Sequence, residues 1–215
     1  MTYTINLEMT KSPPPTDDDP ARRASRAAAV KVALRGRSLV LVGMMGVGKT
    51  SIGRRLAAAL DMPFIDADVE IETAARMTIL EIFERYGEPQ FRDSERRVIA
   101  RILSEQQTVV ATGGGAFINP FTRTTITERG VSIWLKADVD VLLQRVRRRS
   151  NRPLLQSEDP EQTLRRLTEE RDPYYEQADF CVVSQDGPHH TMVDSILETL
   201  ETQLEKLPRL IRSRR

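Results

Sequence analysis

Residues 39–50 read LVLVGMMGVGKT, an apolar run that breaks into glycines and then meets a lysine and a threonine. From Gly43 onward the run matches G-x-x-x-x-G-K-T, the pattern of a phosphate-binding loop between a buried strand and a helix. Such a loop turns its backbone N–H groups inward, and the helix N-terminus behind it favours negative charge. The pattern predicts a nucleoside triphosphate site formed by Gly46, Val47, Gly48, Lys49, Thr50 and Ser51.

The side chains that follow the glycines have separate predicted roles. Lys49 can reach the β- and γ-phosphates as a mobile point charge, and the Thr50 hydroxyl can ligate Mg²⁺. The flanking sequence supports this interpretation, because an apolar run precedes the loop and Ile52, Leu56 and Leu60 fall on one face of a predicted helix after it. We therefore expect ATP and Mg²⁺ as ligands.

The composition limits the kind of protein. With 215 residues, 40% of them hydrophobic, the chain can bury one sizeable core, which favours a single α/β domain. The net charge of +1 offers no global attraction to nucleic acid or to an anionic membrane. No run approaches the roughly 18 apolar residues of a membrane span, and the single cysteine, Cys181, cannot form an internal disulfide. We expect a cytoplasmic protein that binds neither nucleic acid nor membrane, and we take it to be a monomer.

The two ends of the chain differ from its centre. Residues 1–35 contain a proline triplet and an acidic triplet, without the apolar core of a secretory signal, and predict a flexible N-terminal extension with a short helix at 21–34. The part rich in Ala and Arg resembles a transit peptide, but the acidic triplet before it argues against that interpretation. Residues 36–206 form the predicted folded domain, and residues 207–215 form a basic C-terminal tail.

Strand-like and helix-like segments alternate between these ends. The five runs that read as strands lie at residues 39–42, 64–66, 108–112, 131–135 and 180–183. Amphipathic or capped segments separate them, and no internal repeat is visible. This alternation predicts an α/β fold with a parallel five-stranded sheet and helices on both of its faces.

Asp66 and Asp68 follow the second predicted strand, where ligands bind in an open parallel sheet. Phosphoryl transfer needs a carboxylate that orients the attacking hydroxyl and accepts its proton, and it needs oxygen ligands for Mg²⁺. Two aspartates could divide these tasks, and the residues alone leave open which one is the base. The alternative is a purely structural N-cap, since aspartates commonly precede helices.

Arg92, Arg152 and Arg171 are candidate anion-binding residues. A planar guanidinium binds carboxylate or phosphate groups bidentately, so arginines that converge on one cleft would suit an anionic acceptor as well as ATP. Arg152 ends an arginine-rich run that begins at Arg145 and could by itself be a nucleic-acid patch. Because the run lacks interleaved aromatics and acidic residues follow it, we interpret about residues 147–159 as a mobile lid over the triphosphate.

A phosphate-binding loop alone does not distinguish a kinase from a GTPase switch or a motor ATPase. The guanine-specifying pattern N-K-x-D is absent, which disfavours a GTPase. The chain is also too short for the usual motor ATPase. A kinase that acts on a small molecule is therefore the leading interpretation.

Six motifs in order along the chain resemble the shikimate kinase family. They are the phosphate loop at 43–50, FIDAD at 64–68, GEPQFR at 87–92, GGG at 113–115, RPLL at 152–155 and RDPYY at 171–175. The resemblance covers about residues 37–206. It implies a P-loop kinase fold of the nucleoside-monophosphate-kinase type, and transfer of the ATP γ-phosphate to the 3-hydroxyl of shikimate in aromatic amino-acid biosynthesis.

The resemblance also implies roles for the residues of the acceptor site. Asp68 matches the aspartate that binds the acceptor hydroxyls and acts as base, and Asp66 matches the one that helps to hold Mg²⁺ through water. Arg92 and Arg171 match the arginines that clamp the shikimate carboxylate. Glu95 is placed to orient Arg92.

Further matches concern the backbone and the nucleotide. Gly114 and Gly115 match the backbone that touches the acceptor, and Arg152 matches a lid arginine near the transferred phosphate. Arg145 lies where the family places an arginine against adenine. The resulting predicted catalytic residues are Asp68, Lys49 and Arg152.

Two alternatives stay open at this point. A kinase of the same fold could act on another small acid such as gluconate, with the same phosphate loop but a different acceptor pocket. A non-catalytic protein that binds nucleotide could tolerate the loss of Asp68. Release of ADP with and without shikimate distinguishes these alternatives.

Overall fold

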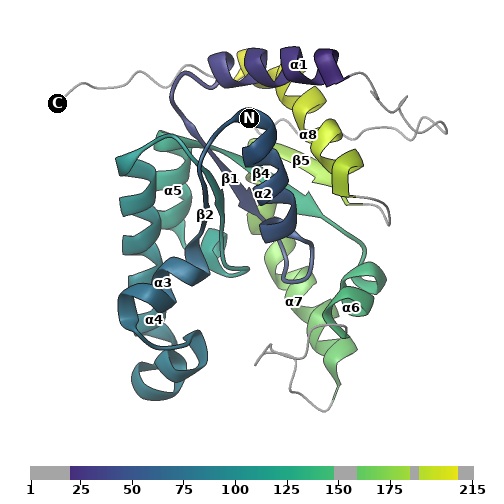
Figure 1. Ribbon diagram of the computed structural model, residues 1–215. Helices are drawn as coiled ribbons and strands as arrows, with labels where there is room; N and C mark the ends of the chain where they lie inside the picture. Colours follow the sequence, from purple (N-terminus) through teal and green to yellow (C-terminus); the bar gives the residue numbers. More distant parts are fainter. Residues whose placement is uncertain (1–19, 148–158, 185–188, 208–215) are drawn as a thin grey trace.

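The computed structural model describes residues 20–147, 159–184 and 189–207. Five parallel strands form one sheet with the order β2-β3-β1-β4-β5 (Figure 1). The strands are β1 (Ser38–Val42), β2 (Phe64–Asp66), β3 (Val109–Ala111), β4 (Gly130–Lys136) and β5 (Phe180–Val183). This arrangement confirms the predicted five-stranded parallel sheet.

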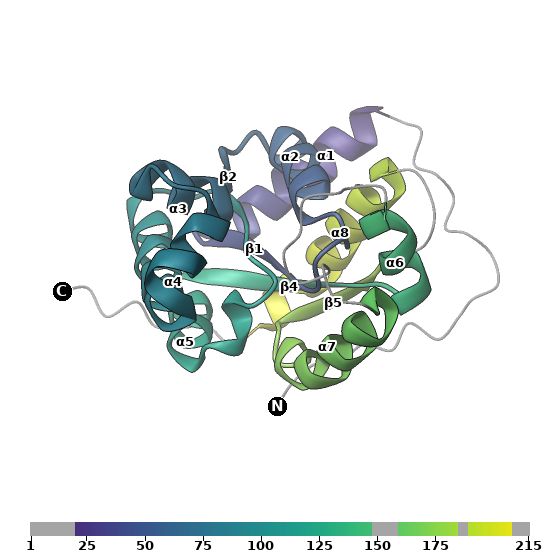
Figure 2. The same cartoon turned by 90° about the horizontal axis from the view of Figure 1, so that it is seen from below.

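Helices cover both faces of the sheet. One face carries α1, α2 and α8, and the opposite face carries α4, α5 and α7 (Figure 2). The helices are α1 (Pro20–Ala33), α2 (Lys49–Leu60), α3 (Ala67–Ala75), α4 (Ile79–Glu105), α5 (Pro120–Arg129), α6 (Val139–Arg147), α7 (Pro160–Tyr175) and α8 (His189–Gln203). Because the sheet is covered on both sides, all residues of the central strand β1 are buried.

The strand order sets the position of the ligand crevice. β1 and β3 are neighbours, but the chain leaves β1 into α2 on one face and leaves β3 toward α5 on the other. In open α/β sheets, ligands bind at the carboxyl ends of the strands where neighbouring connections diverge in this way. The loop after β1 is the phosphate loop, and the loop after β3 contains Gly113–Gly115. The two motifs therefore meet at one crevice.

Helix α4 contains a break at Gly87. It begins at a capping box, in which the Glu81 N–H donates to Thr78 Oγ1 (3.3 Å) and the Thr78 N–H donates to Glu81 Oε2 (2.7 Å). Gly87 interrupts the helical backbone with φ 77° and ψ 171°, and the helix resumes behind it. The second part of α4 carries Arg92 and Glu95.

Helix α1 agrees with the short helix predicted at residues 21–34, and it packs on the folded core. Its apolar stripe packs against α2 and α8, and Lys31 Nζ donates to the carbonyl oxygen of Asp61 (2.6 Å) at the end of α2. The buried residues of this stripe are Ala27, Val30 and Leu34. Their spacing places them on one helical face, so burying that face stabilises the segment. Residues 1–19, and residues 208–215 of the predicted tail, lie outside the described part.

A substitution in α1 tests whether this helix belongs to the folded core. Val30 is 0% exposed and Val32 is 78% exposed, although both are valines of one helix. Val30→Ala is expected to lower the free energy of unfolding by about 2 kcal/mol, because it removes buried methyl groups. Val32→Ala should leave that free energy unchanged or raise it slightly, because alanine favours helix. Equal effects of the two substitutions in urea denaturation would show that α1 does not pack in solution.

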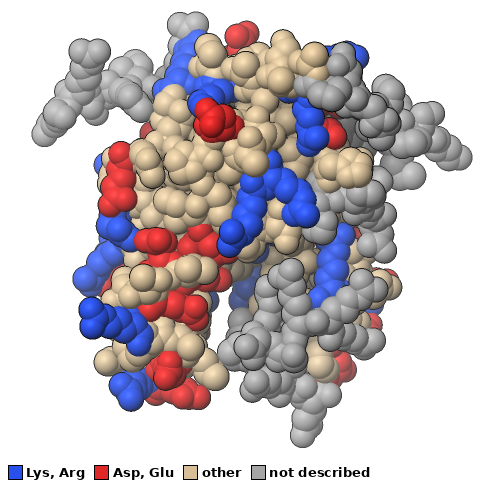
Figure 3. Space-filling view, viewed as in Figure 1, with Lys and Arg blue, Asp and Glu red and all other residues tan. Residues whose placement is uncertain are grey.

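The surface beside the sheet is notched on the side of α3 and α4 (Figure 3). Acidic side chains gather over these two helices, among scattered basic ones, as the same view shows. No helix within the described ranges combines the length and the apolar character needed to cross a membrane.

Candidate active site

The phosphate loop joins the end of β1 to the start of α2. Gly46 has φ 84°, and a Cβ atom built there would lie 2.7 Å from Val146 Cγ2, so the position requires glycine. Gly48 precedes α2, and no side chain caps this helix N-terminus. The first backbone N–H groups of α2 are therefore available to bind an anion. Lys49 Nζ donates to the carbonyl oxygens of Gly43 (2.7 Å) and Met44 (2.9 Å), which holds its ammonium against the loop.

The other predicted nucleotide-binding residues lie along this loop and the first turn of α2. Val47 is fully buried within the loop. Ser51 is partly exposed in the first turn of α2. Arg145, near the end of α6, donates from Nη1 to the Val47 carbonyl (3.3 Å) and to Ser184 Oγ (3.0 Å). Arg145 therefore lies beside the loop, as its predicted contact with adenine requires.

Thr50 and Asp66 meet at the opening of the phosphate loop. Thr50 Oγ1 donates to Asp66 Oδ2 at 2.7 Å, and Asp66 Oδ1 accepts the backbone N–H of Asp68 at 3.1 Å. Asp66 is therefore an N-cap of α3 and also a neighbour of the predicted Mg²⁺ ligand Thr50. These hard oxygens beside a phosphate site suit Mg²⁺, which commonly takes few protein ligands and completes its shell with phosphate and water. The described residues contain no group of three or more His, Cys, Asp or Glu that could hold a metal without such help.

Gly113 brings two carboxylates together at the acceptor side of the crevice. A Cβ atom built on Gly113 would lie 2.7 Å from Glu95 Oε1 and 2.8 Å from Asp68 Oδ1. These oxygens come from α4 and α3 and approach the loop after β3 from one side. A side chain at position 113 would displace them. Gly113 thus allows Asp68 to approach the loop.

The next two glycines each lie against a predicted clamp arginine. A Cβ atom on Gly114 would lie 3.4 Å from the backbone N of Met45 and 3.6 Å from Arg171 Nη1. One on Gly115 would lie 2.6 Å from Arg92 Nη1. Arg92 and Arg171 therefore flank consecutive residues, although one comes from α4 and the other from α7.

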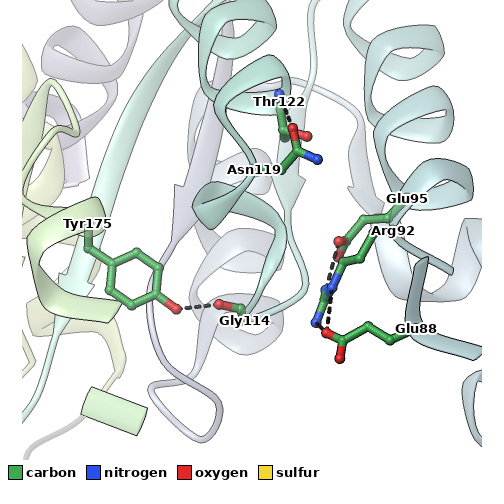
Figure 4. A network of polar contacts seen from close by, with 7 residues as sticks. All are labelled: Glu88, Arg92, Glu95, Gly114, Asn119, Thr122 and Tyr175. Carbon is green, nitrogen blue, oxygen red and sulfur yellow. Dashed lines mark hydrogen bonds and ion pairs between the residues drawn. The ribbon is translucent and has the colours of Figure 1, made fainter. Parts of the chain in front are cut away.

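Two carboxylates hold the Arg92 guanidinium (Figure 4). Arg92 Nη1 donates to Glu95 Oε2 (2.8 Å), while Nε and Nη2 donate to Glu88 Oε1 (3.1 and 3.0 Å). Glu95 is 2% exposed, and its Oε1 has no hydrogen-bond partner within the described part of the chain. Burial raises the pKa of the Glu95 carboxyl, and the charge of Arg92 acts in the opposite direction. The prediction that Glu95 is placed to orient Arg92 agrees with this contact.

Comparison with known proteins identifies the family. The family model of shikimate kinase matches residues 45–201, from within the phosphate loop through most of α8. The chain belongs to the shikimate kinase family. All the predicted site residues of this family lie within the matched segment.

Two curated relatives show how far the similarity extends. A shikimate kinase from Bradyrhizobium diazoefficiens is 58% identical over 182 residues, which cover 85% of this chain and 88% of that protein. A shikimate kinase from Nitrobacter winogradskyi is 59% identical over 181 residues, covering 84% of this chain and 85% of that protein. The similarity therefore covers most of each protein.

Solved structures agree on the fold. A shikimate kinase from Acinetobacter baumannii in complex with shikimate has a TM-score of 0.76 and 40% identity, covering 80% of this chain and 97% of that one. A gluconokinase from Sinorhizobium meliloti reaches a TM-score of 0.55 at 21% identity, covering 80% of this chain and 95% of that one. The second likeness shows a shared fold only.

Part of the site predicted for this shikimate kinase lies outside the described residues. The predicted lid, about residues 147–159, lies almost wholly outside the described residues, and so does Arg152. Three residues at the site had no role assigned from the sequence: Gly113, Tyr175 and Glu88, which holds the Arg92 guanidinium together with Glu95. Gly113 is the first of three consecutive glycines, so the same motif that indicated Gly114 and Gly115 could have indicated it. Tyr175 lies four residues after Arg171 on α7, so helical spacing places both on one face.

Gly115→Ala tests the close approach of Arg92 in this member of the shikimate kinase family. The added Cβ atom would lie 2.6 to 2.7 Å from three atoms of the guanidinium, which must then move. Because misplacement by about 1 Å can cost up to 10²-fold, we expect the KM for shikimate to rise about tenfold or more while the KM for ATP stays unchanged. Gly130→Ala is the control, since its Cβ would be crowded at 3.1 Å by Ser38 O at the opposite end of the sheet. Equal KM values for shikimate in the parent and G115A chains would contradict the role of this contact.

The buried carboxyl of Glu95 makes stability depend on pH. A raised folded pKa means that the stability contributed by Glu95 is complete below its unfolded pKa of about 4.3 and is lost as pH rises through the folded pKa. Glu95→Gln removes this titration. The free energy of unfolding of the parent chain should therefore fall relative to that of the E95Q variant as pH rises above about 4. Urea denaturation at several pH values measures this difference, and a constant difference would overturn the assignment.

Proposed function

We propose that this chain transfers the γ-phosphate of ATP to the 3-hydroxyl of shikimate, with Thr50 and Asp66 holding Mg²⁺. One observation carries the proposal. Three consecutive glycines, Gly113–Gly115, lie against Asp68, Arg171 and Arg92 in turn, and the middle glycine also lies against the backbone of the phosphate loop. An acceptor bound on these glycines would have its hydroxyl beside the phosphates.

The acceptor that this arrangement favours is a carboxylated polyol. Arg92 and Arg171 offer two guanidinium groups, whose planar forks match a carboxylate. Asp68 offers a carboxylate oxygen to a hydroxyl beside the first of the three glycines. The named relatives, and the neighbour solved with shikimate, support shikimate as this acid.

Catalysis would rest on positioning and on fixed charge. Asp68 orients the attacking hydroxyl and accepts its proton as the new P–O bond forms and the bond to ADP breaks. Lys49 and Arg152 stabilise negative charge on the phosphoryl oxygens, and Arg171 and Arg92 hold the acceptor carboxylate so that the hydroxyl is in line. Thr50 and Asp66 would hold Mg²⁺, which would supply positive charge beside the phosphates. Closure of the lid would exclude water as a competing acceptor.

A coupled ADP-release assay tests this function. The purified chain receives ATP and Mg²⁺ with shikimate, with gluconate or with no acceptor. Turnover that requires shikimate supports the proposal. Turnover with gluconate alone would favour the alternative small-acid kinase, and release of ADP that no acceptor changes would favour a nucleotide-binding protein without transfer. A series of Mg²⁺ concentrations, with EDTA as a control, tests the metal requirement.

We also propose that the enzyme works as a monomer in the cytoplasm. Asp68, Arg171 and Arg92 of a single chain all reach Gly113–Gly115, so this part of the site needs no residue from a second copy. Light scattering during size-exclusion chromatography measures the mass in solution. A dimer whose activity falls on dilution would contradict the monomeric state.

A further inference from the structure

Tyr175 lies where the acceptor loop, the phosphate loop and helix α7 meet. Its side chain is 1% exposed, and its hydroxyl donates a hydrogen bond to the carbonyl oxygen of Gly114 (Figure 4). The same hydroxyl oxygen is 3.8 Å from Met44 Sδ in the phosphate loop. The phenol ring packs beside Trp134 of β4, with ring centroids 5.9 Å apart. The ring therefore has a packing role, which is separate from the contact of its hydroxyl.

The hydroxyl of Tyr175 is a permanent donor to Gly114. The hydroxyl of Tyr175 has one hydrogen to donate, and a carbonyl oxygen is a far better acceptor of it than the thioether sulfur of Met44. Burial raises the pKa of Tyr175 to about 12, with the charge of Arg171 acting in the opposite direction, so the phenol keeps its proton at any working pH. Without this donor, a partly buried carbonyl in the glycine loop would lose its protein partner.

Two groups of α7 act on the same glycine. Arg171 and Tyr175 are four residues apart, so they lie on one face of the helix. Arg171 Nη1 lies against the Cα side of Gly114, and the Tyr175 hydroxyl binds the carbonyl oxygen of Gly114. The backbone N of Met45 (3.4 Å) and the carbonyl oxygen of Gly43 (3.8 Å) lie near the same Cβ position as Arg171 Nη1, so the phosphate loop and Arg171 approach this glycine together. The Gly114 peptide thus contacts both α7 and the phosphate loop.

We propose that Tyr175 is a positioning residue, whose hydroxyl fixes the Gly114 peptide against the phosphate loop and so sets the acceptor in line with the γ-phosphate. This inference rests on the proposed function, because it assigns Tyr175 to the acceptor side of that reaction. It separates the hydroxyl, which orients the acceptor loop, from the ring, which fills the core beside Trp134.

Tyr175→Phe tests the hydroxyl while it keeps the ring. We expect kcat/KM for shikimate to fall about tenfold or more, because the Gly114 carbonyl loses the donor that positions the acceptor loop. The KM for ATP should stay within about twofold, since the nucleotide contacts proposed for Lys49 and Thr50 are untouched. Tyr174→Phe is the matched control: it removes a hydroxyl from the adjacent tyrosine, which is 37% exposed, and should leave both constants unchanged.

Binding measurements complete the test and do not depend on turnover. Calorimetric titration of the Y175F variant should show weaker binding of shikimate and unchanged binding of ADP. A double-mutant cycle with Arg171→Lys should be non-additive for shikimate, because both side chains act on Gly114. Unchanged shikimate constants, or an equal loss for shikimate and nucleotide, would overturn the proposal and leave Tyr175 a packing residue. Failure of the proposed function would look different, since the parent chain itself would then show no turnover that requires shikimate.

Discussion

Lys49→Ala is expected to abolish measurable turnover while the fold survives. In the structure the Lys49 ammonium lies against the carbonyl oxygens of Gly43 and Met44 in the phosphate loop. No side chain caps the N-terminus of helix α2, which follows this loop. Removing one preorganised group that stabilises transition-state charge costs about 10²- to 10³-fold, and a full positive charge beside the transferring phosphoryl group should cost at least that much. The coupled ADP-release assay with shikimate measures the loss.

The control for this variant is Lys206→Ala, which removes the same side chain from an exposed position after α8. K206A should keep the kcat of the parent chain. Both variants should unfold at urea concentrations close to that of the parent, because the Lys49 side chain is only partly buried. A K49A chain that is folded and retains kcat would refute the assignment of the phosphate loop.

Asp68→Asn should lower kcat by about 10²- to 10⁴-fold, the range that positioned proton transfer contributes. The amide is nearly isosteric with the carboxyl, so the approach of Asp68 to Gly113 is kept while the proton acceptor is lost. The Kd for ADP should change little, because the Thr50–Asp66 contact does not involve the Asp68 side chain. Rapid-mixing kinetics of a single turnover isolate the chemical step.

Glu70→Gln provides the comparison on the same helix. Glu70 lies in the first turn of α3, as Asp68 does, but its carboxylate pairs with Arg101 at 2.7 Å. The Glu70→Gln substitution should therefore leave kcat unchanged. A D68N variant with the kcat of the parent chain would remove Asp68 from the catalytic residues, and it would reopen Asp66 as the base of the reaction.

Much of the fold was predictable because short-range geometry encodes it. The pattern of residues 43–50 demands a strand before it and a helix after it, and both are present as β1 and α2. The capping box at Thr78 and the break at Gly87 were predictable for the same reason, since caps and glycine interruptions depend on a few adjacent residues. The short helix predicted at residues 21–34 is present as α1, but its packing against α8 and α2 was not predictable, because that burial depends on distant segments and not on the composition of the helix.

Some features of the candidate site depend on adjacent residues, and others depend on residues far apart in the chain. Sequence motifs alone identify the nucleotide-binding residues, because they are contiguous and their chemistry depends on a single loop. They also mark Asp68, Arg92 and Arg171 as candidates. The motifs do not show which atoms these side chains contact. Each lies against its own glycine of 113–115 only because β3 pairs with β1 and places its loop between α3, α4 and α7.

The contact between Tyr175 and Gly114 shows this limit most clearly. The two residues are 61 positions apart, and nothing near either one in the chain indicates the other. Local patterns are set by steric and hydrogen-bonding rules over a few residues, so the amino-acid order specifies the phosphate loop, the strands and the chemical types at the site. The partners of those groups depend on strand order and helix packing. For that reason the adjacency of Asp68 to Gly113 and the junction at Tyr175 became visible only in the folded chain.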